Sequence, residues 1–488
     1  MEKKSKNPMK RLLPLLLLPL LLISCGRTAT VDEFDIVPEP VFMVKKEGTF
    51  TLNRSVAIAT AGLGQNSPTA KYIMNSLRHL RLHPSLVSLS EESDIDLIIN
   101  DTVNPELGDE GYLLEVRQSG IRLSANSETG LLYAYQTFLQ MLPHDIETHR
   151  YRSFVLPECT ILDYPRFPWR GVFLEGDRQR FGVKFIKKQL DIMAIYKMNQ
   201  FLLQQPDSTS FANNNPADTS GGYDFAEHVY TPEEIADIID YATALSISVH
   251  VGDSTLQWDD SILAPHSTLK GESLIISRKS MASAQQAARM GYRVIVCPDD
   301  HCRLDCYQAD RRYQPAATEG LITLAQAYLF DPAPQGTNKY VEQNILGGQA
   351  NLWTTHIAST SAAEYMLLPR MLAISESLWS PHDNKNWNHF RKKVEIQKQR
   401  LDDLKYSYCE GSFTPIFRAT RVDSHTTNIA IETEVPSTYI FFTTDGSKPS
   451  RNSQVYIGPV NLHRGTHIKI LPVYKDSERD SVYEYIIK

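Results

Sequence analysis

The stretch ILGGQANLW at residues 345–353, together with WRGVFLEGDR at residues 169–178, decides the fold of this 488-residue chain. Each contains an apolar run of strand length, and the sequence between them alternates short apolar runs with segments of helical periodicity. The expected strands are Gly171–Leu174, Gln200–Gln204, Ile247–Val251, Leu274–Ser277, Val294–Pro298 and Ile345–Leu352, and the expected helices are Val183–Tyr196, Glu233–Leu245 and Ala282–Met290. Parallel strands joined by helical crossovers predict an α/β fold of the (β/α)8 TIM-barrel type or a relative of it.

The predicted barrel is about one unit short. Six strands are clear, and Ser254–Trp258 is a weak seventh. Only 22 residues run from Gly252 to Ser273, whereas one βαβ unit takes about 30 or more. We therefore expect a barrel that is incomplete or that closes with a rearranged segment.

Two further domains flank the barrel region, which we place at residues 166–400. Residues 30–165 interleave strands with helices and predict a small α/β domain. Residues 407–488 contain only short alternating runs, with a turn at 444–447, and predict an all-β domain of sandwich-like type. In the first domain, the adjacent pair Asp109 and Glu110 is interpreted as a solvated turn at a strand entrance.

Composition narrows the class of protein. With 42% hydrophobic and 22% charged residues the chain is globular, and its length suits about three domains. A net charge of -7 gives no indication of a nucleic-acid partner. The sequence has no Walker-type loop, no GxGxxG and no His-Glu-x-x-His string, so phosphate, dinucleotide and zinc-protease sites have no support.

The N-terminus has the pattern of an export signal. A basic stretch within residues 3–11 precedes the apolar run Leu12–Ile23, which is shorter than the roughly 20 residues that span a bilayer. The string LISC at residues 22–25 is typical of a bacterial lipobox, in which Cys25 carries lipid; the alternative is an ordinary thiol beside a plain cleavage site. We expect residues 1–25 to be a signal peptide and the protein to be an exported lipoprotein, on the periplasmic or cell-surface side of a membrane that it meets only through its anchor.

Five other cysteines remain, at positions 159, 297, 302, 306 and 409. An odd number leaves at least one thiol unpaired within an exported chain. Three of them lie near His301, but their spacing matches no zinc pattern. We interpret them as small buried residues with at most one local disulfide, and we expect no metal site.

The strings PRFPWRG (165–171) and ILGGQANLW (345–353) resemble the first and last strands of the barrel of β-N-acetylhexosaminidases, glycoside hydrolase family 20. Residues 108–142 resemble the domain that precedes such barrels, and residues 440–460 resemble a small β domain found on some members. The resemblance implies release of terminal GlcNAc or GalNAc from glycans, without metal or organic cofactor. In this family the sugar's own acetamido oxygen attacks the anomeric carbon, so the protein supplies an acid, an Asp that polarises the acetamide, and groups that hold the sugar.

The resemblance assigns three sugar-binding residues. Arg178 matches the arginine that binds the C3 and C4 hydroxyls, a task suited to the fixed fork of a guanidinium; a strand-end salt bridge is the alternative. Trp353 matches a tryptophan that stacks on the sugar, against the alternative of a plain core residue. Asp305 matches an aspartate that grips the ring.

Other positions depart from the family pattern. Arg303 stands where the family has a Tyr that bonds the acetamide, Arg278 where a Trp walls the acetamide pocket, and Thr355 where a Glu grips hydroxyls. A charge in an apolar pocket is costly unless it is paired. The family's His-x-Gly-Gly-Asp-Glu string, which carries the catalytic pair, does not occur in the sequence.

Three aspartates are candidates for the missing acid. Asp253 ends a shortened string, HVGD, in which Ser254 replaces the Glu; Asp299 and Asp300 follow a predicted strand directly. Barrel enzymes do their chemistry at that face, and two adjacent carboxylates there can share a proton. The sequence thus leaves open a hexosaminidase of impaired or lost activity, a non-catalytic glycan-binding or scaffold protein on the same frame, and a product that does not fold stably.

Overall fold

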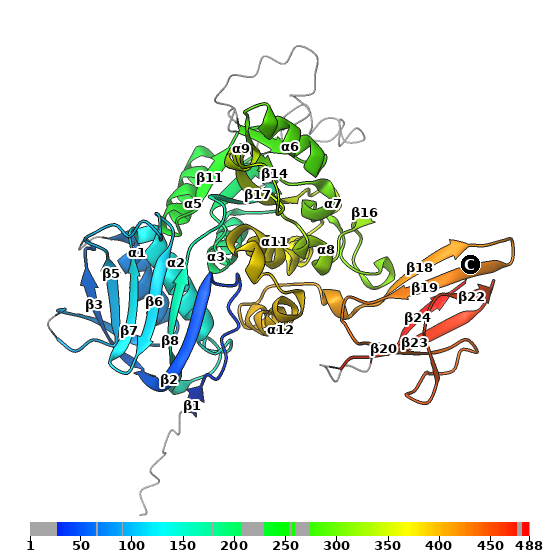
Figure 1. Ribbon diagram of the computed structural model, residues 1–488, viewed down its shortest axis with the longest axis horizontal. Coiled ribbons are helices and arrows are strands. Elements are labelled where there is room, and N and C mark those ends of the chain that lie inside the picture. The colour runs from blue at the N-terminus through cyan, green and yellow to red at the C-terminus, as the bar shows by residue number, and fades with distance from the viewer. Residues whose placement is uncertain are drawn as a thin grey trace, which may run out of the picture.

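The computed structural model describes residues 27–64, 67–89, 91–177, 179–205, 229–252, 256–258, 274–475 and 481–487. Three units follow one another along the chain: an N-terminal α/β unit, a central unit of parallel strands and helices, and a C-terminal β unit (Figure 1). No helix among these residues combines the length and the apolar character needed to cross a membrane.

The N-terminal unit is one eight-stranded sheet with two helices. The strands run in the order β1-β8-β6-β7-β5-β3-β4, and β2 also pairs with β8. They are β1 (Arg27–Thr30), β2 (Phe42–Asn53), β3 (Ser55–Ala61), β4 (His83–Val87), β5 (Ile95–Ile99), β6 (Tyr112–Arg117), β7 (Gly120–Ala125) and β8 (Tyr151–Asp163), with helices α1 (Pro68–His79) and α2 (Glu128–Met141). Side chains of β6 alternate between buried and half-buried, as expected for a sheet covered on one face. The small α/β domain predicted from the sequence is confirmed.

The central sheet has seven parallel strands in the order β11-β10-β9-β17-β14-β13-β12. They are β9 (Trp169–Glu175), β10 (Gln200–Gln204), β11 (Ser248–Val251), β12 (Leu256–Trp258), β13 (Leu274–Ser277), β14 (Arg293–Val296) and β17 (Ile345–Leu352). The first and last strands, β9 and β17, lie side by side, as a barrel requires. β11 and β12 are the two ends of the sheet, so the described part of the barrel is open there, and among the described residues no strand pairs with both.

Helices cover this sheet. They are α3 (Val183–Ile195), α5 (Pro232–Ala244), α6 (Met281–Arg289), α7 (Asp299–Cys302), α8 (Leu324–Tyr328), α9 (Lys339–Asn344), α10 (Thr360–Leu367), α11 (Arg370–Trp379) and α12 (Trp387–Asp403). The short strands β15 (Cys306–Tyr307) and β16 (Thr318–Leu321) and the 3-10 turns η3 (Arg311–Tyr313), η4 (His382–Asn384) and η5 (Gly411–Phe413) complete the unit. Helix α5 begins with a capping box between Thr231 and Glu234, in which each side chain accepts a hydrogen bond from the backbone amide of the other residue.

The C-terminal unit is all β, as predicted. One sheet holds β18 (Ile416–Arg421), β19 (Thr426–Glu432) and β22 (Val460–His463), and a second holds β21 (Gln454–Val455), β20 (Tyr439–Thr443), β23 (His467–Val473) and β24 (Tyr483–Ile486). Arg312 of η3 joins this unit to the barrel: its guanidinium lies 4.7 Å from the ring of Phe417 and 4.3 Å from that of Tyr485, and it donates to the Glu484 carbonyl at 2.9 Å.

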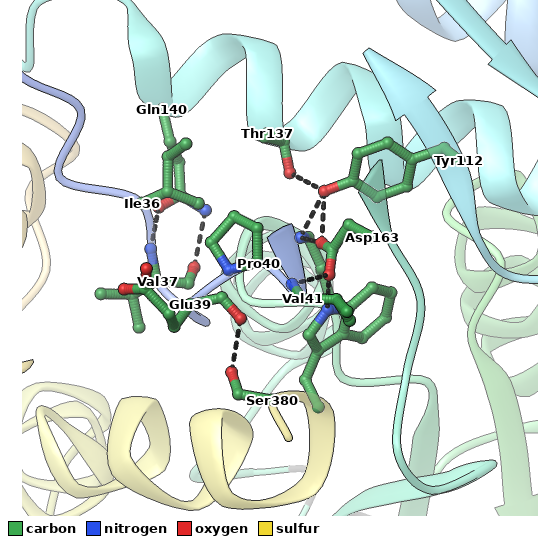
Figure 2. Close-up of polar contacts among 12 residues, drawn as sticks. Ile36, Val37, Glu39, Pro40, Val41, Tyr112, Thr137, Gln140, Asp163 and Ser380 are labelled. Atoms are coloured by element: carbon green, nitrogen blue, oxygen red, sulfur yellow. Dashed lines mark hydrogen bonds and ion pairs between the residues drawn. The ribbon is translucent and has the colours of Figure 1, made fainter. Parts of the chain in front are cut away.

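A largely buried network joins the N-terminal unit to the barrel. Asp163 at the end of β8 accepts hydrogen bonds from Val41 N (3.0 Å), Tyr112 Oη (2.5 Å), Trp379 Nε1 (2.8 Å) and Lys197 Nζ (2.8 Å). Figure 2 shows Tyr112 and Val41 converging on Asp163. The Asp163 carboxylate thus has four donors and the Lys197 ammonium a counter-ion, which is how buried charges are tolerated.

Glu110 takes part in the same interface. It lies half-buried and accepts bonds from both terminal nitrogens of Arg170, at 2.7 and 3.1 Å, although Arg170 itself is fully buried. The interpretation of Glu110 as part of a solvated turn is therefore wrong, because Glu110 pairs with a buried arginine of the barrel. That arginine lies 60 positions further along the chain, so the pairing is not visible in the local sequence. Its partner in the sequence pair, Asp109, is exposed as expected.

The five described cysteines are buried thiols, and no disulfide joins them. The expected burial is confirmed, and the single local disulfide that the sequence allowed is absent among them. Within the described residues no group of three or more His, Cys, Asp or Glu side chains is arranged to hold a metal ion.

Candidate functional site

Three aromatic rings meet at the carboxyl edge of the barrel, where β9, β12 and β17 end. The ring of Trp353, directly after β17, lies 4.6 Å from that of Phe173 and 5.7 Å from that of Trp258, and the Phe173 and Trp258 rings are 5.4 Å apart. Trp353 and Trp258 are half-buried, so part of each ring stays accessible. We call these three residues the aromatic wall; accessible ring faces of this kind suit the C–H faces of a sugar.

Arg278 lies beside the aromatic wall. It follows β13, and its guanidinium is 5.9 Å from the centre of the Trp353 ring. The same guanidinium forms an ion pair with Asp299, with Nη1 to Oδ2 at 3.8 Å, and the Asp299 amide donates to the Arg278 carbonyl at 2.7 Å. The sequence places Arg278 where the family has an apolar wall; in the structure its charge is met by an aspartate and an aromatic face.

The two adjacent aspartates of α7 have different surroundings. Asp299 pairs with Arg278, whereas the Asp300 side chain is 70% exposed and contacts His301 Nδ1 at 2.7 Å. The structure thus pairs Asp299 with Arg278, which lies beside the aromatic wall, and places Asp300 largely in solvent. Each carboxylate has a basic neighbour of its own.

Arg303 and Asp305 form a pair after α7. Arg303 donates to Asp305 from Nε at 3.1 Å and from Nη2 at 3.3 Å, and the Asp305 side chain is only 4% exposed. Burial is the largest influence and lowers the pKa of Arg303. The hydrogen bond to Asp305 and the charges of Asp305, Cys306 and Asp299 together outweigh burial, so the net shift is upward. The segment is held against β17, because Leu304 N donates to the Asn351 carbonyl at 2.7 Å.

Glu175 ends β9 and holds the residue after Trp353. Thr354 N donates to Glu175 Oε2 at 2.8 Å, and Thr354 Oγ1 donates to the Glu175 carbonyl at 3.1 Å. Arg180 reinforces the junction by donating to the carbonyls of Thr354 and Ile357. The backbone that carries Trp353 is therefore fixed to the first barrel strand.

A hollow of about 330 Å³ opens beside the aromatic wall, between the ends of β10, β11 and β12. Phe173, Gln204, Gly252 and Trp258 line it, together with His250. The His250 ring lies 5.2 Å from that of Trp169, and its Nε2 is 2.8 Å from Gln200 Oε1. The hollow thus has a mixed lining, in which apolar side chains alternate with polar ones such as Gln204, Gln205 and His250.

The structure places the sequence-predicted residues as follows. Trp353, Asp299 and Arg278 come together, and Asp305 lies with Arg303 beside β17. Arg178, Asp253 and Cys25 lie outside the described residues, although Asp253 directly follows Gly252 at the hollow.

Sequence reasoning did not single out Phe173. A signal was present, because Trp169, Gly171, Phe173 and Glu175 alternate along β9 and therefore share one face of the strand.

Comparison with known proteins identifies the class. The model for glycosyl hydrolase family 20, catalytic domain, matches residues 167–252 and 249–382, and the model for domain 2 of that family matches residues 33–164. The model termed Fn3 associated matches residues 429–484. The chain therefore belongs to glycosyl hydrolase family 20, the β-hexosaminidase family, and carries both its catalytic-type domain and its second domain.

Individual relatives agree with this. The chain is similar to a β-hexosaminidase of Porphyromonas gingivalis, 23% identical over 78% of this chain and 66% of the relative, and to the human β-hexosaminidase subunit β, 34% identical over 34% of this chain and 28% of the relative. It thus spans somewhat under two thirds of the first relative and less than a third of the second.

Solved structures show the same fold. A family 20 exo-β-N-acetylglucosaminidase of Vibrio harveyi, in complex with N-acetylglucosamine, superposes with a TM-score of 0.64 at 19% identity, over 80% of both chains. The N-acetyl-β-hexosaminidase of Streptomyces plicatus gives a TM-score of 0.63 at 20% identity, over 78% of this chain and 97% of that one.

Proposed function

We propose that this chain binds the terminal N-acetylhexosamine of a glycan at the carboxyl edge of its barrel and does not cleave the glycosidic bond. The observation that carries the proposal is the aromatic wall with Arg278 beside it: an accessible ring surface next to a hydrogen-bond donor, opening on a hollow of mixed polar and apolar lining. Relatives in this family supply the ligand class, since the Vibrio harveyi structure is a complex with N-acetylglucosamine.

The loss of hydrolysis is supported by the carboxylates at this edge. A general acid must hold a proton and present it to the leaving oxygen. Asp299 pairs with Arg278 and Asp305 with Arg303, so each of these two carboxylates already has a guanidinium partner. The sequence also lacks the family's His-x-Gly-Gly-Asp-Glu string.

The way in which the family model matches supports a deletion at this point. Its two matched segments overlap at residues 249–252, so the end of β11 serves both as the end of one piece and as the start of the next. These four residues cannot form two different strands of the barrel, and the described part of the sheet is open at this point. In our proposal the deleted unit carried the acid.

The proposed binding residues are Trp353, Asp305 and Arg178. Trp353 stacks on the sugar ring. Asp305, which is paired with Arg303, and Arg178 form hydrogen bonds with the sugar hydroxyls, because their planar groups can bind two oxygens at once. If the protein does hydrolyse glycosides, the acid is one of Asp253, Asp299 and Asp300, of which Asp299 lies at the aromatic wall.

One experiment separates these functions. The chain from Gly26 onward is titrated with GlcNAc by calorimetry and assayed for hydrolysis of an aryl N-acetyl-β-glucosaminide. We expect saturable binding without turnover, lost in Arg178→Ala and Trp353→Ala but kept in Arg293→Ala, an exposed arginine at the start of β14. Turnover that disappears in Asp253→Asn or Asp299→Asn would show an active enzyme instead.

We also propose that the protein is an exported lipoprotein anchored through Cys25. The basic stretch, the short apolar run and the string LISC at residues 22–25 support this. Metabolic labelling with palmitate should mark the wild type and not Cys25→Ala, and unlabelled wild type in the membrane-free fraction would refute the anchor.

A further inference from the structure

A cleft of about 610 Å³ lies at the junction of the N-terminal unit and the barrel helices. Its walls come from α1, α2, α3, α5 and the end of α12, and Figure 1 shows the first four of these helices at that junction. None of the residues that line it also lines the hollow at the carboxyl edge. We call it the interdomain cleft.

Two buried polar atoms of the interdomain cleft have no hydrogen-bond partner among the described residues: Arg400 Nε and Gln136 Oε1. Arg400 is 9% exposed and Gln136 is 1% exposed. The rest of each side chain is fixed, because Arg400 Nη2 donates to the Leu142 carbonyl at 3.0 Å and Gln136 Nε2 donates to Tyr72 Oη at 3.3 Å. A buried polar group left unmatched costs about 1–3 kcal/mol. Both side chains belong to the lining of the cleft, so a ligand that matched these two atoms would remove that cost.

Two carboxyl groups add further hydrogen-bonding capacity. Asp191 accepts from Tyr241 Oη at 2.6 Å, and Glu147 lies in the same lining. Burial is the main cause that raises the pKa of both groups, and for Glu147 the charges of His79 and Arg400 act in the opposite direction. Each carboxyl has oxygens that a hydroxyl can reach, since Asp and Glu accept more than one bond.

The charges of the cleft are mixed. The lining holds the cationic Arg400 together with the acidic Asp191 and Glu147, and the charge of Glu147 acts on Arg400. The nearby Lys188 is already paired with Glu364 at 2.6 Å. A strongly anionic or cationic ligand would meet a like charge on one side. Half-buried Tyr72 and Tyr241 supply aromatic surface between the polar groups.

We propose that the interdomain cleft is a second carbohydrate site, which takes a neutral monosaccharide or disaccharide. A polyol offers donors for Gln136 Oε1 and the two carboxyls and an acceptor for Arg400 Nε, and its C–H faces lie on the tyrosine rings. The volume falls within the range of about 300–1,000 Å³ typical of small-molecule pockets. The proposal does not rest on the function of the carboxyl edge.

The test is a calorimetric titration of the full chain, solubilised in detergent, with D-glucose, D-galactose, cellobiose and lactose. None of these sugars carries an acetamido group, so the carboxyl edge is not expected to select them. We expect saturable binding of at least one, weakened 10-fold or more in Gln136→Leu and in Asp191→Asn. Asp240→Asn, an exposed carboxyl on the same helix as Tyr241, is the matched control and should bind as the wild type does.

Asn75→Trp is the second variant, because this exposed residue lines the cleft from α1 and can be enlarged without touching the buried groups. It should block binding while its thermal unfolding stays like that of the wild type. Failure of all four sugars to bind, binding that persists in Asn75→Trp, or binding that is lost in Trp353→Ala would each overturn the proposal.

Discussion

The guanidinium of Arg303 holds the carboxylate of Asp305 by two hydrogen bonds, of 3.1 and 3.3 Å, two positions apart in the sequence. Family resemblance assigns Asp305 to the sugar ring and the Arg303 position to a tyrosine. In this chain the two residues are instead hydrogen-bonded to each other. A sugar that binds here must therefore share Asp305 with an arginine that never releases its charge.

The Arg303–Asp305 pair should be coupled in stability. Because the Asp305 side chain is only 4% exposed, Arg303→Leu leaves a nearly buried carboxylate without its partner, and we expect a loss of about 2 kcal/mol or more. Asp305→Asn combined with Arg303→Leu should lose less than the sum of the two single changes. Urea unfolding of the four proteins measures the coupling, and strictly additive losses would mean that the pair is not a unit.

The buried Lys197 should matter far more than a surface lysine. Lys197→Met removes the counter-ion of Asp163 inside the interface, where both side chains are fully buried, and we expect a loss of about 3–5 kcal/mol. Lys187→Met removes a similar 2.7 Å pair with Asp237 at the surface and should cost less than about 1 kcal/mol. Equal midpoints of thermal unfolding for the two variants would contradict the role given to the network.

Stability should fall as the pH rises from about 4.5 to about 7. Burial in α11 raises the pKa of Glu376 from 4.5 to about 7, with Lys393 opposing the shift and Glu39 adding to it. The folded state then holds a proton that the unfolded state releases, so this contribution of about 3 kcal/mol is fully present below pH 4.5 and lost as the pH passes 7. Lys385, whose pKa burial lowers to about 8, titrates above this window.

Glu376→Gln tests this prediction. It keeps the shape of the side chain and removes the titration, so the free energy of unfolding should become flatter between pH 4.5 and 7. Asp383→Asn is the control, because that side chain is 91% exposed. If Glu376→Gln and wild type show the same slope, the group does not titrate in this range.

Gly347 should tolerate no side chain. Its φ is +137°, and a Cβ there would lie 2.0 Å from the Trp169 carbonyl oxygen on the neighbouring strand. Gly347→Ala must therefore push β17 away from β9, and we expect the cooperative melt to be lost. Gly458→Ala, where a Cβ meets nothing within 4 Å, should melt as the wild type does. A well-folded Gly347→Ala protein would show that β9 and β17 need not lie this close.

Much of the candidate site could be located from the sequence, though not its contacts. Trp353 and Asp299 are found because they follow apolar runs of strand length, and the ends of parallel strands meet at one edge. The contact between Arg278 and Trp353 is invisible in the sequence, since it joins the ends of two strands that are not neighbours in the sheet.

Sequence alone determined the order of the described strands and helices and the all-β C-terminal unit. These features are local: side-chain periodicity and chain length report on segments of a few to some thirty residues. Only the tertiary structure decided that Glu110 pairs with Arg170, that Asp163 is buried against Lys197, and that three rings meet beside a hollow. Such contacts depend on how distant segments pack, because a carboxylate in a turn looks the same in sequence whether water or a guanidinium faces it.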